Sequence, residues 1–164
     1  MCSNFRRASG SETGDSIGPS PVLVPLPIMG DSMAAIIDLA ALLAQMEPVL
    51  HGEDYGYACL AAGQAVPDGV RPFATVAEAE GMTVVALAAE LVAAGVPHQG
   101  PWARISLTVT SDLAAVGLTA AIATALAARG ISANVVAGYH HDHVFVQADR
   151  AAAAMAGLRG LADV

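Results

Sequence analysis

The chain has 164 residues, 55% hydrophobic and 13% charged, with a formal net charge of −8. Its seven basic side chains are all arginines. The acidic balance argues against a nucleic-acid partner, and the lack of lysine excludes Schiff-base chemistry and a Walker-type phosphate loop. The length suits one compact domain or two small fused units. Two cysteines, Cys2 and Cys59, are too few for a disulfide framework.

Residues 1–32 are rich in Ser, Gly and Pro and have no hydrophobic periodicity, which predicts a disordered extension. Met29 and Met33 are alternative candidate starts. The apolar stretch 21–29 is interrupted by three prolines and lacks a cleavage motif, so we do not predict a signal peptide. No apolar run is long enough for a membrane span. We therefore expect a cytoplasmic protein with no membrane partner.

The next part, residues 33–100, alternates helical and strand patterns. A cap at Asp31–Ser32 and apolar residues at helical spacing predict the first helix, and Glu80–Gly81 predicts a hairpin turn. The sequence HQGP at 98–101 is expected to be a linker. In chain order, the predicted elements are a helix over 36–50, strands over 55–60, 73–77 and 82–87, and a helix over 88–94.

The last part, residues 101–164, begins with alternating residues over 104–109, typical of a half-buried strand. Ser111 and Asp112 offer side-chain oxygens as helix caps, and Gly130 is a suitable C-terminal stop. Asp149 can cap a last helix. The remaining predicted elements are a helix over 112–129, a strand over 131–137, a turn over 138–142, a strand over 143–147 and a final helix.

This order predicts antiparallel strands with the helices on one face, an α+β, ferredoxin-like architecture. The first half reads as a degenerate version of the second, in pattern rather than in residue identity.

The second half resembles the ACT domain, and in particular short bacterial proteins built from two ACT-like units. The resemblance extends upstream to about Asp38. Family members often carry His and Ser where this chain has Thr110 and Asp112. The matching positions are Ser111, Leu113, Ala115–Ala120, Asn134–Tyr139 and His141–Val146.

The resemblance implies two βαββα-type units, at 33–100 and 101–164, and a regulatory protein rather than an enzyme. It implies a small-molecule ligand, an amino acid, acting through the interface of a homo-oligomer, most simply a homodimer. No cofactor is expected. A structural interaction module without a ligand is the alternative from another class.

The expected ligand site lies at the start of the 112–129 helix. The N–H groups after Ser111 favour an anion, Asp112 can meet an ammonium group, and the small residues allow close approach. An ordinary capped helix packed on a sheet is the competing interpretation. The candidate ligand-binding residues are Ser111, Asp112, Leu113, Ala115, Val116, Gly117, Asn134, Ala137, Gly138 and Tyr139.

The turn His140–His143 carries three histidines and an aspartate. His141 and His143 on one strand face could supply two metal ligands, which leaves a metal-binding protein or an enzyme as a further alternative. Zinc sites use three or four ligands, and His51 and His98 stand isolated in the sequence. A polar hairpin is the simpler interpretation. We find no nucleophile elbow, HExxH or glycine-rich phosphate loop.

Overall fold

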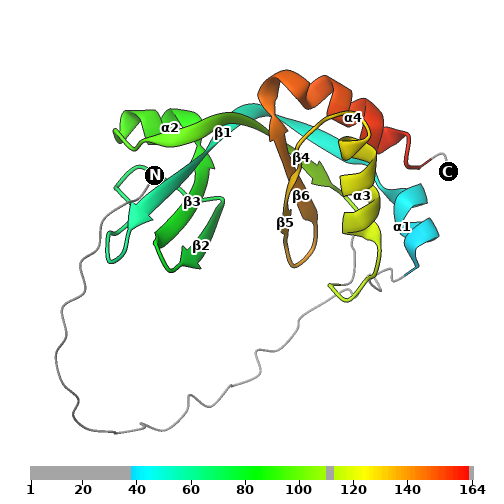
Figure 1. The fold of residues 1–164 in the computed structure, drawn as a ribbon, viewed down its shortest axis with the longest axis horizontal. Helices are drawn as coiled ribbons and strands as arrows, with labels where there is room; N and C mark the ends of the chain where they lie inside the picture. The colour runs from blue at the N-terminus through cyan, green and yellow to red at the C-terminus, as the bar shows by residue number, and fades with distance from the viewer. Residues whose placement is uncertain (1–37, 110–112, 163–164) are drawn as a thin grey trace, which may run out of the picture. The chain divides into compact units, whose positions relative to one another are not determined.

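The computed structural model describes residues 38–109 and 113–162 (Figure 1). The predicted extension 1–32 and the predicted cap at Asp31–Ser32 lie outside these residues. The helices are α1 (Leu39–Gln45), α2 (Ala88–Ala93), α3 (Leu118–Ala127), η1 (Ala148–Arg150) and α4 (Ala151–Arg159). The strands are β1 (Pro48–Ala61), β2 (Ala74–Glu78), β3 (Gly81–Leu87), β4 (His98–Leu107), β5 (Asn134–Ala137) and β6 (Asp142–Gln147).

The six strands form one antiparallel sheet in the order β2-β3-β1-β4-β6-β5. The long strands β1 and β4 pair at its centre, and the hairpins β2–β3 and β5–β6 flank them on either side (Figure 1). Strands β2 and β5 are therefore the two edges. The pairing of β1 with β4 shifts register between Leu50 and Asp54 and again between Tyr55 and Tyr57.

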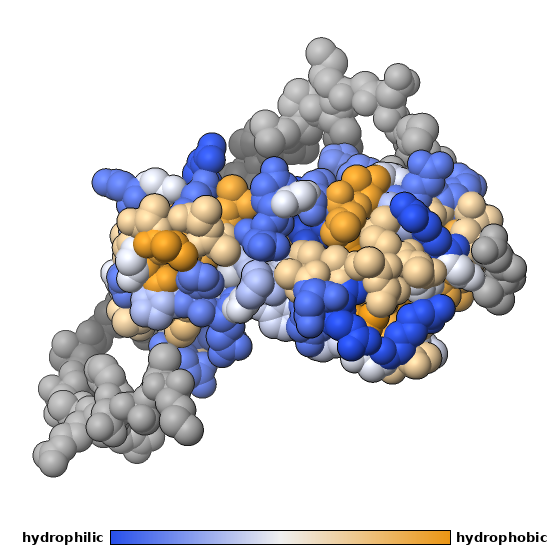
Figure 2. Space-filling view, turned by 90° about the horizontal axis from the view of Figure 1, so that it is seen from above, coloured by the Kyte–Doolittle hydropathy of each residue, from blue (hydrophilic) through white to orange (hydrophobic). Residues whose placement is uncertain are grey.

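All the helices cover one face of the sheet. On this face, α1, α3 and α4 pack on β4 and β6, where Ile105 and Val144 are fully buried. Leu91 of α2 packs on β1 and β3. Hydrophobic residues on this side form separate groups among hydrophilic ones on the surface (Figure 2). The predicted ferredoxin-like α+β fold with helices on one face is confirmed.

The other face of the sheet carries most of the aromatic residues. Phe145 is fully buried there, and its ring contacts Tyr55, Tyr57 and Phe73 edge-on, with centroids 5.4–5.7 Å apart. Trp102 contacts Tyr57 at 5.8 Å. We call Tyr55, Tyr57, Phe73, Trp102 and Phe145 the aromatic cluster. It forms a hydrophobic core that includes no helix residue.

Several local predictions are confirmed. The predicted hairpin is present, with its turn at Ala79–Glu80 between β2 and β3. The predicted apolar face of α3, formed by Leu118, Ile122 and Leu126, is buried. Helix α1 is capped by Asp38, whose Oδ1 accepts from the Ala41 N–H at 2.9 Å. No helix among the described residues has the length and apolarity needed to cross a membrane.

Other local predictions are wrong. Pro48–Leu50, expected at the end of the first helix, opens β1, since a strand start tolerates the missing proline N–H. The segment 98–101 is the start of β4 rather than a linker, because its backbone pairs with β1. The strand predicted over 131–137 is formed only from Asn134 onward. Asp149 lies in η1, and α4 has Arg150 at its N-cap.

Candidate functional site

The expected helix start is displaced in the structure. Helix α3 begins at Leu118, and Gly117 is its N-cap with φ at +104°, so the prediction that the helix starts at residue 112 is wrong. Left-handed backbone suits glycine, and a Cβ on Gly117 would lie 2.9 Å from Leu39 Cδ2. The turn at Gly117 and its contact with α1 therefore set the helix start. Ser111 and Asp112 lie outside the described residues.

The other predicted site residues lie on two segments, one between β4 and α3 and one formed by β5 and the turn that follows it. Leu113 and Val116, before α3, are 68% and 84% exposed, and Ala115 packs at the edge of the helix-side core. Tyr139, in the β5–β6 turn, is 77% exposed. Asn134 and Ala137 are exposed on edge strand β5, and Gly138 follows that strand. Three large apolar side chains of the predicted site thus face solvent.

A contact between His141 and Val109 brings these two segments together. His141 Nδ1 lies 3.5 Å from the carbonyl oxygen of Val109, where the chain leaves β4 towards α3. The turn is closed by the Gly138 N–H, which donates to the His141 carbonyl at 3.1 Å. A Cβ on Gly138 would lie 2.6 Å from that oxygen, so the tight turn requires glycine.

The histidines of this turn do not converge on one point. His143 Nδ1 bonds to Ser106 and His141 Nδ1 faces Val109, while His140 is exposed. Among residues 38–109 and 113–162, there is no group of three or more His, Cys, Asp or Glu side chains that could hold a metal ion.

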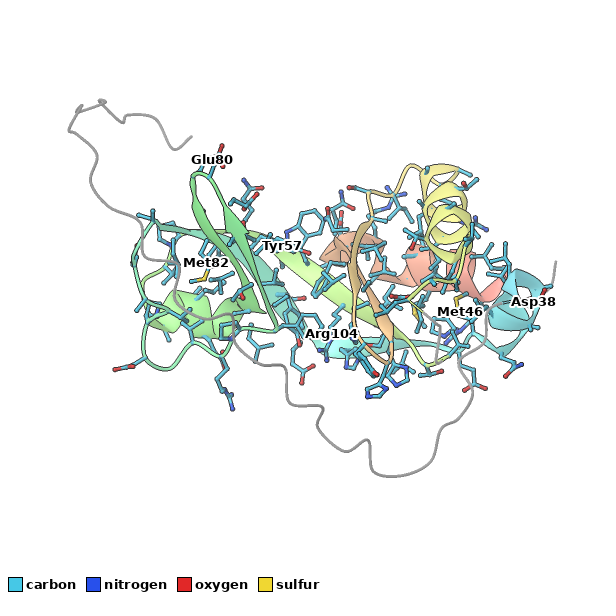
Figure 3. All side chains as sticks on the ribbon, turned by 90° about the horizontal axis from the view of Figure 1, so that it is seen from below. Asp38, Met46, Tyr57, Glu80, Met82 and Arg104 are labelled. Carbon is cyan, nitrogen blue, oxygen red and sulfur yellow. The ribbon has the colours of Figure 1, made fainter. Side chains whose placement is uncertain are left out.

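A chain of four polar side chains crosses the aromatic face of the sheet. An Arg104 terminal nitrogen donates to His51 Nδ1 at 2.9 Å, and His51 Nε2 lies 2.8 Å from Ser106 Oγ. Ser106 Oγ lies 2.8 Å from His143 Nδ1. We call Arg104, His51, Ser106 and His143 the polar chain. Strands β1, β4 and β6 each contribute to it, and Arg104 and Tyr57 are labelled on this face in Figure 3.

The arginine sets the direction of the first two hydrogen bonds in the polar chain. Because a guanidinium only donates, His51 Nδ1 must accept, and neutral His51 carries its proton on Nε2. That proton is donated to Ser106 Oγ. We assign the third hydrogen bond as Ser106 Oγ–H donating to His143 Nδ1, which gives the single Ser106 proton a partner. His143 in turn carries its proton on Nε2. A Cβ on Gly138 would lie 3.6 Å from this nitrogen, so the polar chain ends beside the β5–β6 turn.

Charge and burial both favour the neutral histidines. Burial, followed by the nearby Arg104 charge, lowers the pKa of His51, and Glu53 opposes this in part. Burial and Arg104 also lower the pKa of His143, with smaller contributions from His141 and His51, while Asp142 raises it.

Aromatic rings hold the arginine in place. The Arg104 guanidinium carbon lies 5.0 Å from the Tyr55 ring centroid and 4.8 Å from that of Phe73. Phe73 also contacts the His143 ring at 4.9 Å. Phe73 thereby covers both ends of the polar chain from the segment just before β2.

Sequence reasoning missed most of this array. His51 appeared isolated because its partners lie 53 and 55 positions away. The available signal was the alternation of Arg104 and Ser106 along one side of a strand whose other side is apolar, which places two polar groups on one face. Which histidines meet them depends on strand pairing.

Two consecutive segments of the chain match the ACT domain family, over residues 34–103 and 98–160. No curated protein matches the sequence. Among solved structures, the chain is similar to a protein of unknown function from Vibrio cholerae, described as a possible transport protein. The two are 44% identical with a TM-score of 0.68, and the match covers 76% of this chain and 95% of that one.

Two more distant similarities concern the fold alone. One is to a protein from Agrobacterium tumefaciens, at 18% identity and a TM-score of 0.62, covering 72% of this chain and 90% of that one. The other is to the ligand-free regulatory subunit of aspartate kinase from Thermus thermophilus, at 13% identity and a TM-score of 0.51, covering 70% and 95%.

Proposed function

Because this chain belongs to the ACT domain family, we propose that it is a regulatory protein that binds a free amino acid at an interface between copies of itself. ACT domains are regulatory rather than catalytic modules. The two family matches overlap on 98–103, within β4, which supports a division into units at 33–100 and 101–164. The cytoplasmic location stays a prediction from the sequence.

The observation that carries this proposal is the pairing of two exposed loops at one end of the sheet. The segment that leads to α3 and the β5–β6 turn meet through His141 and Val109, and both expose large apolar side chains. Contiguous exposed apolar side chains are typical of a binding or association surface, and we propose that the two segments form one such surface. Leu113, Val116 and Tyr139 are the side chains concerned.

The start of α3 supplies the complementary charge. Gly117 has no side chain to cap the first N–H groups of this ten-residue helix, which begin at Leu118. These groups and the helix dipole favour a carboxylate. The proposed amino acid therefore has its carboxylate at Leu118–Ala120, rather than after Ser111, and its side chain against Val116 or Tyr139.

A thermal-shift screen over the twenty amino acids, followed by calorimetry with the best ligand, tests the proposal. Val116→Ser and Tyr139→Ser remove exposed apolar surface without opening the core, so both should weaken binding while the fold is kept. Val92→Ser is the matched control, because Val92 is 68% exposed on α2, on a different element. Should none of the amino acids raise the melting temperature at millimolar concentration, the proposed function is wrong and a structural module without a ligand is the better interpretation.

A further inference from the structure

We propose that the aromatic face of the sheet binds a small carboxylate, with Arg104 as its charged anchor. This site lies on the face opposite the helices. It is separate from the amino-acid site proposed at the start of α3, and it is indicated by a different set of observations.

The first observation is a group of buried polar atoms without hydrogen-bond partners. In the part of the chain that the structure describes, these atoms are Arg104 Nε, Tyr57 Oη, Trp102 Nε1 and Gln147 Oε1. Leaving such an atom buried and unpaired destabilises the fold, so native proteins pair nearly all of them with protein, water or ligand.

The second observation is that all four atoms belong to one face. Trp102 on β4 pairs directly with Gln147 on β6, and Arg104 follows two positions later on the same side of β4. Tyr57 on β1 contacts Trp102 through its ring. The residues that carry the unpaired atoms therefore lie on one face of three adjacent strands, and three of them, Tyr57, Trp102 and Arg104, contact rings of the aromatic cluster.

The third observation concerns the charge of Arg104. Within 38–109 and 113–162, one ion pair is formed, between Arg71 and Glu90 at 2.7 Å. Arg104 has no carboxylate partner among these residues. Its contacts are the acceptor nitrogen of His51 and the rings of Tyr55 and Phe73. A half-buried cation whose direct contacts are all neutral favours an anion at its free N–H groups.

Three of the four unpaired atoms belong to donor groups and define the chemistry of the ligand, whereas Gln147 Oε1 is an acceptor that a carboxylate does not satisfy. Arg104 Nε and Trp102 Nε1 can only donate, and the Tyr57 hydroxyl can also donate, which suits the two oxygens of a carboxylate. Burial raises the pKa of Tyr57 to about 12, so its hydroxyl keeps its proton at neutral pH. The aromatic rings suit an apolar body on the acid.

Trp102 is the only tryptophan of the chain, so its fluorescence reports on this face alone. The full-length protein is titrated with isovalerate and phenylpropionate, and with their neutral amides as matched controls. We expect a saturable change in emission with the acids and none with the amides. Since a hydrogen bond to a charged group contributes about 1.5–3 kcal/mol, Arg104→Gln should weaken binding by roughly tenfold or more.

Matched variants make the test specific. Arg71→Gln removes an exposed arginine outside this face and should leave the titration unchanged. Tyr57→Phe keeps the ring and removes one donor, so it should weaken binding several-fold even if Arg104→Gln fails to fold. Val116→Ser should leave the Trp102 response intact, which separates this site from the proposed amino-acid site.

Three results would overturn the proposed carboxylate site. If neither acid gives a saturable response up to tens of millimolar, the proposal is overturned, and water is the partner of the four buried atoms. An equal response to acids and amides, or unchanged binding by a folded Arg104→Gln or Tyr57→Phe variant, overturns it too.

Discussion

Ser106 Oγ and His143 Nδ1 lie 2.8 Å apart, although 37 positions separate the two residues. With His51 on the other side of Ser106, the hydroxyl accepts one hydrogen bond and donates the next. The arginine at the end of the polar chain fixes His51 as the neutral form protonated on Nε2, and the assigned donation from Ser106 gives His143 the same form.

Nitrogen NMR of the two imidazoles checks this direction, and we expect both rings as the Nε2–H tautomer near neutral pH. Ser106→Ala should lower the free energy of unfolding by about 1–2 kcal/mol, because it leaves His51 Nε2–H and His143 Nδ1 without partners. Thr108→Ala is the control, since Thr108 Oγ1 makes an exposed bond to the Glu47 carbonyl. An Nδ1–H form of His51 would contradict the assigned direction.

Stability should depend on pH below the ordinary histidine range. The folded state lowers the pKa of His51 and of His143 below 6.5, so at mildly acidic pH the unfolded chain binds more protons. The stabilisation is therefore present above pH 6.5 and is lost as the pH falls through the lowered values. Urea unfolding at about pH 7.5 and about pH 5.5 measures this difference.

The pH effect can be assigned by substitution. His143→Asn should reduce the dependence, because only His51 then titrates in the polar chain. His140→Asn should leave it unchanged, because His140 is exposed and makes no bond to the polar chain. Equal pH dependence in wild type and His143→Asn would contradict the assignment.

Substitution of Gly117 should lower the free energy of unfolding more than substitution of Gly130, another glycine with positive φ. Gly117→Ala forces a side chain into left-handed backbone and against Leu39 Cδ2, 2.9 Å from the new Cβ. Gly130 has φ at +65°, and a Cβ there would meet nothing within 4 Å. Gly130→Ala should therefore lower the free energy of unfolding only by the cost of left-handed backbone, about 1 kcal/mol. The difference between the two free energies of unfolding measures the α1–α3 contact together with the less favourable φ at Gly117, and a larger loss at Gly130 would contradict the prediction.

Tyr57→Phe should raise the melting temperature of the ligand-free protein. The substitution removes a buried hydroxyl without a partner and keeps the ring contacts to Trp102 and Phe145. Removing such an atom is expected to gain about 1 kcal/mol. Tyr55→Phe is a nearby comparison, because Tyr55 Oη is not among the unpaired buried atoms. If Tyr57→Phe lowers the melting temperature, the hydroxyl has a bound partner in the ligand-free protein.

The oligomer predicted from the sequence should be a dimer in solution. Light scattering at micromolar concentration is expected to give the mass of two chains. Combining Val116→Ser with Tyr139→Ser should shift the mass towards one chain, because these side chains expose apolar surface at the proposed interface, whereas Val92→Ser should not. A monodisperse mass of one chain for the wild type contradicts the prediction.

The sequence by itself determined the elements whose stability is local or periodic. Alternation predicted the buried side of β4, the spacing of Leu118, Ile122 and Leu126 predicted the face of α3, and Glu80–Gly81 predicted the β2–β3 turn. Each of these signals depends on residues within a few positions of one another. The ferredoxin-like layering followed from the order of such elements.

Only the tertiary structure decided where elements begin and which polar groups meet. Helix α3 starts at Leu118 because Gly117 turns against Leu39, a contact between distant segments that overrides the local capping signal of Ser111 and Asp112. Likewise, His51 meets Ser106 and Arg104 because β1 pairs with β4 in one register, and register is set by the fit of whole strands. A pattern read along the chain contains no distance between its parts, so the polar chain and the unpaired atoms around Arg104 could be found only in three dimensions.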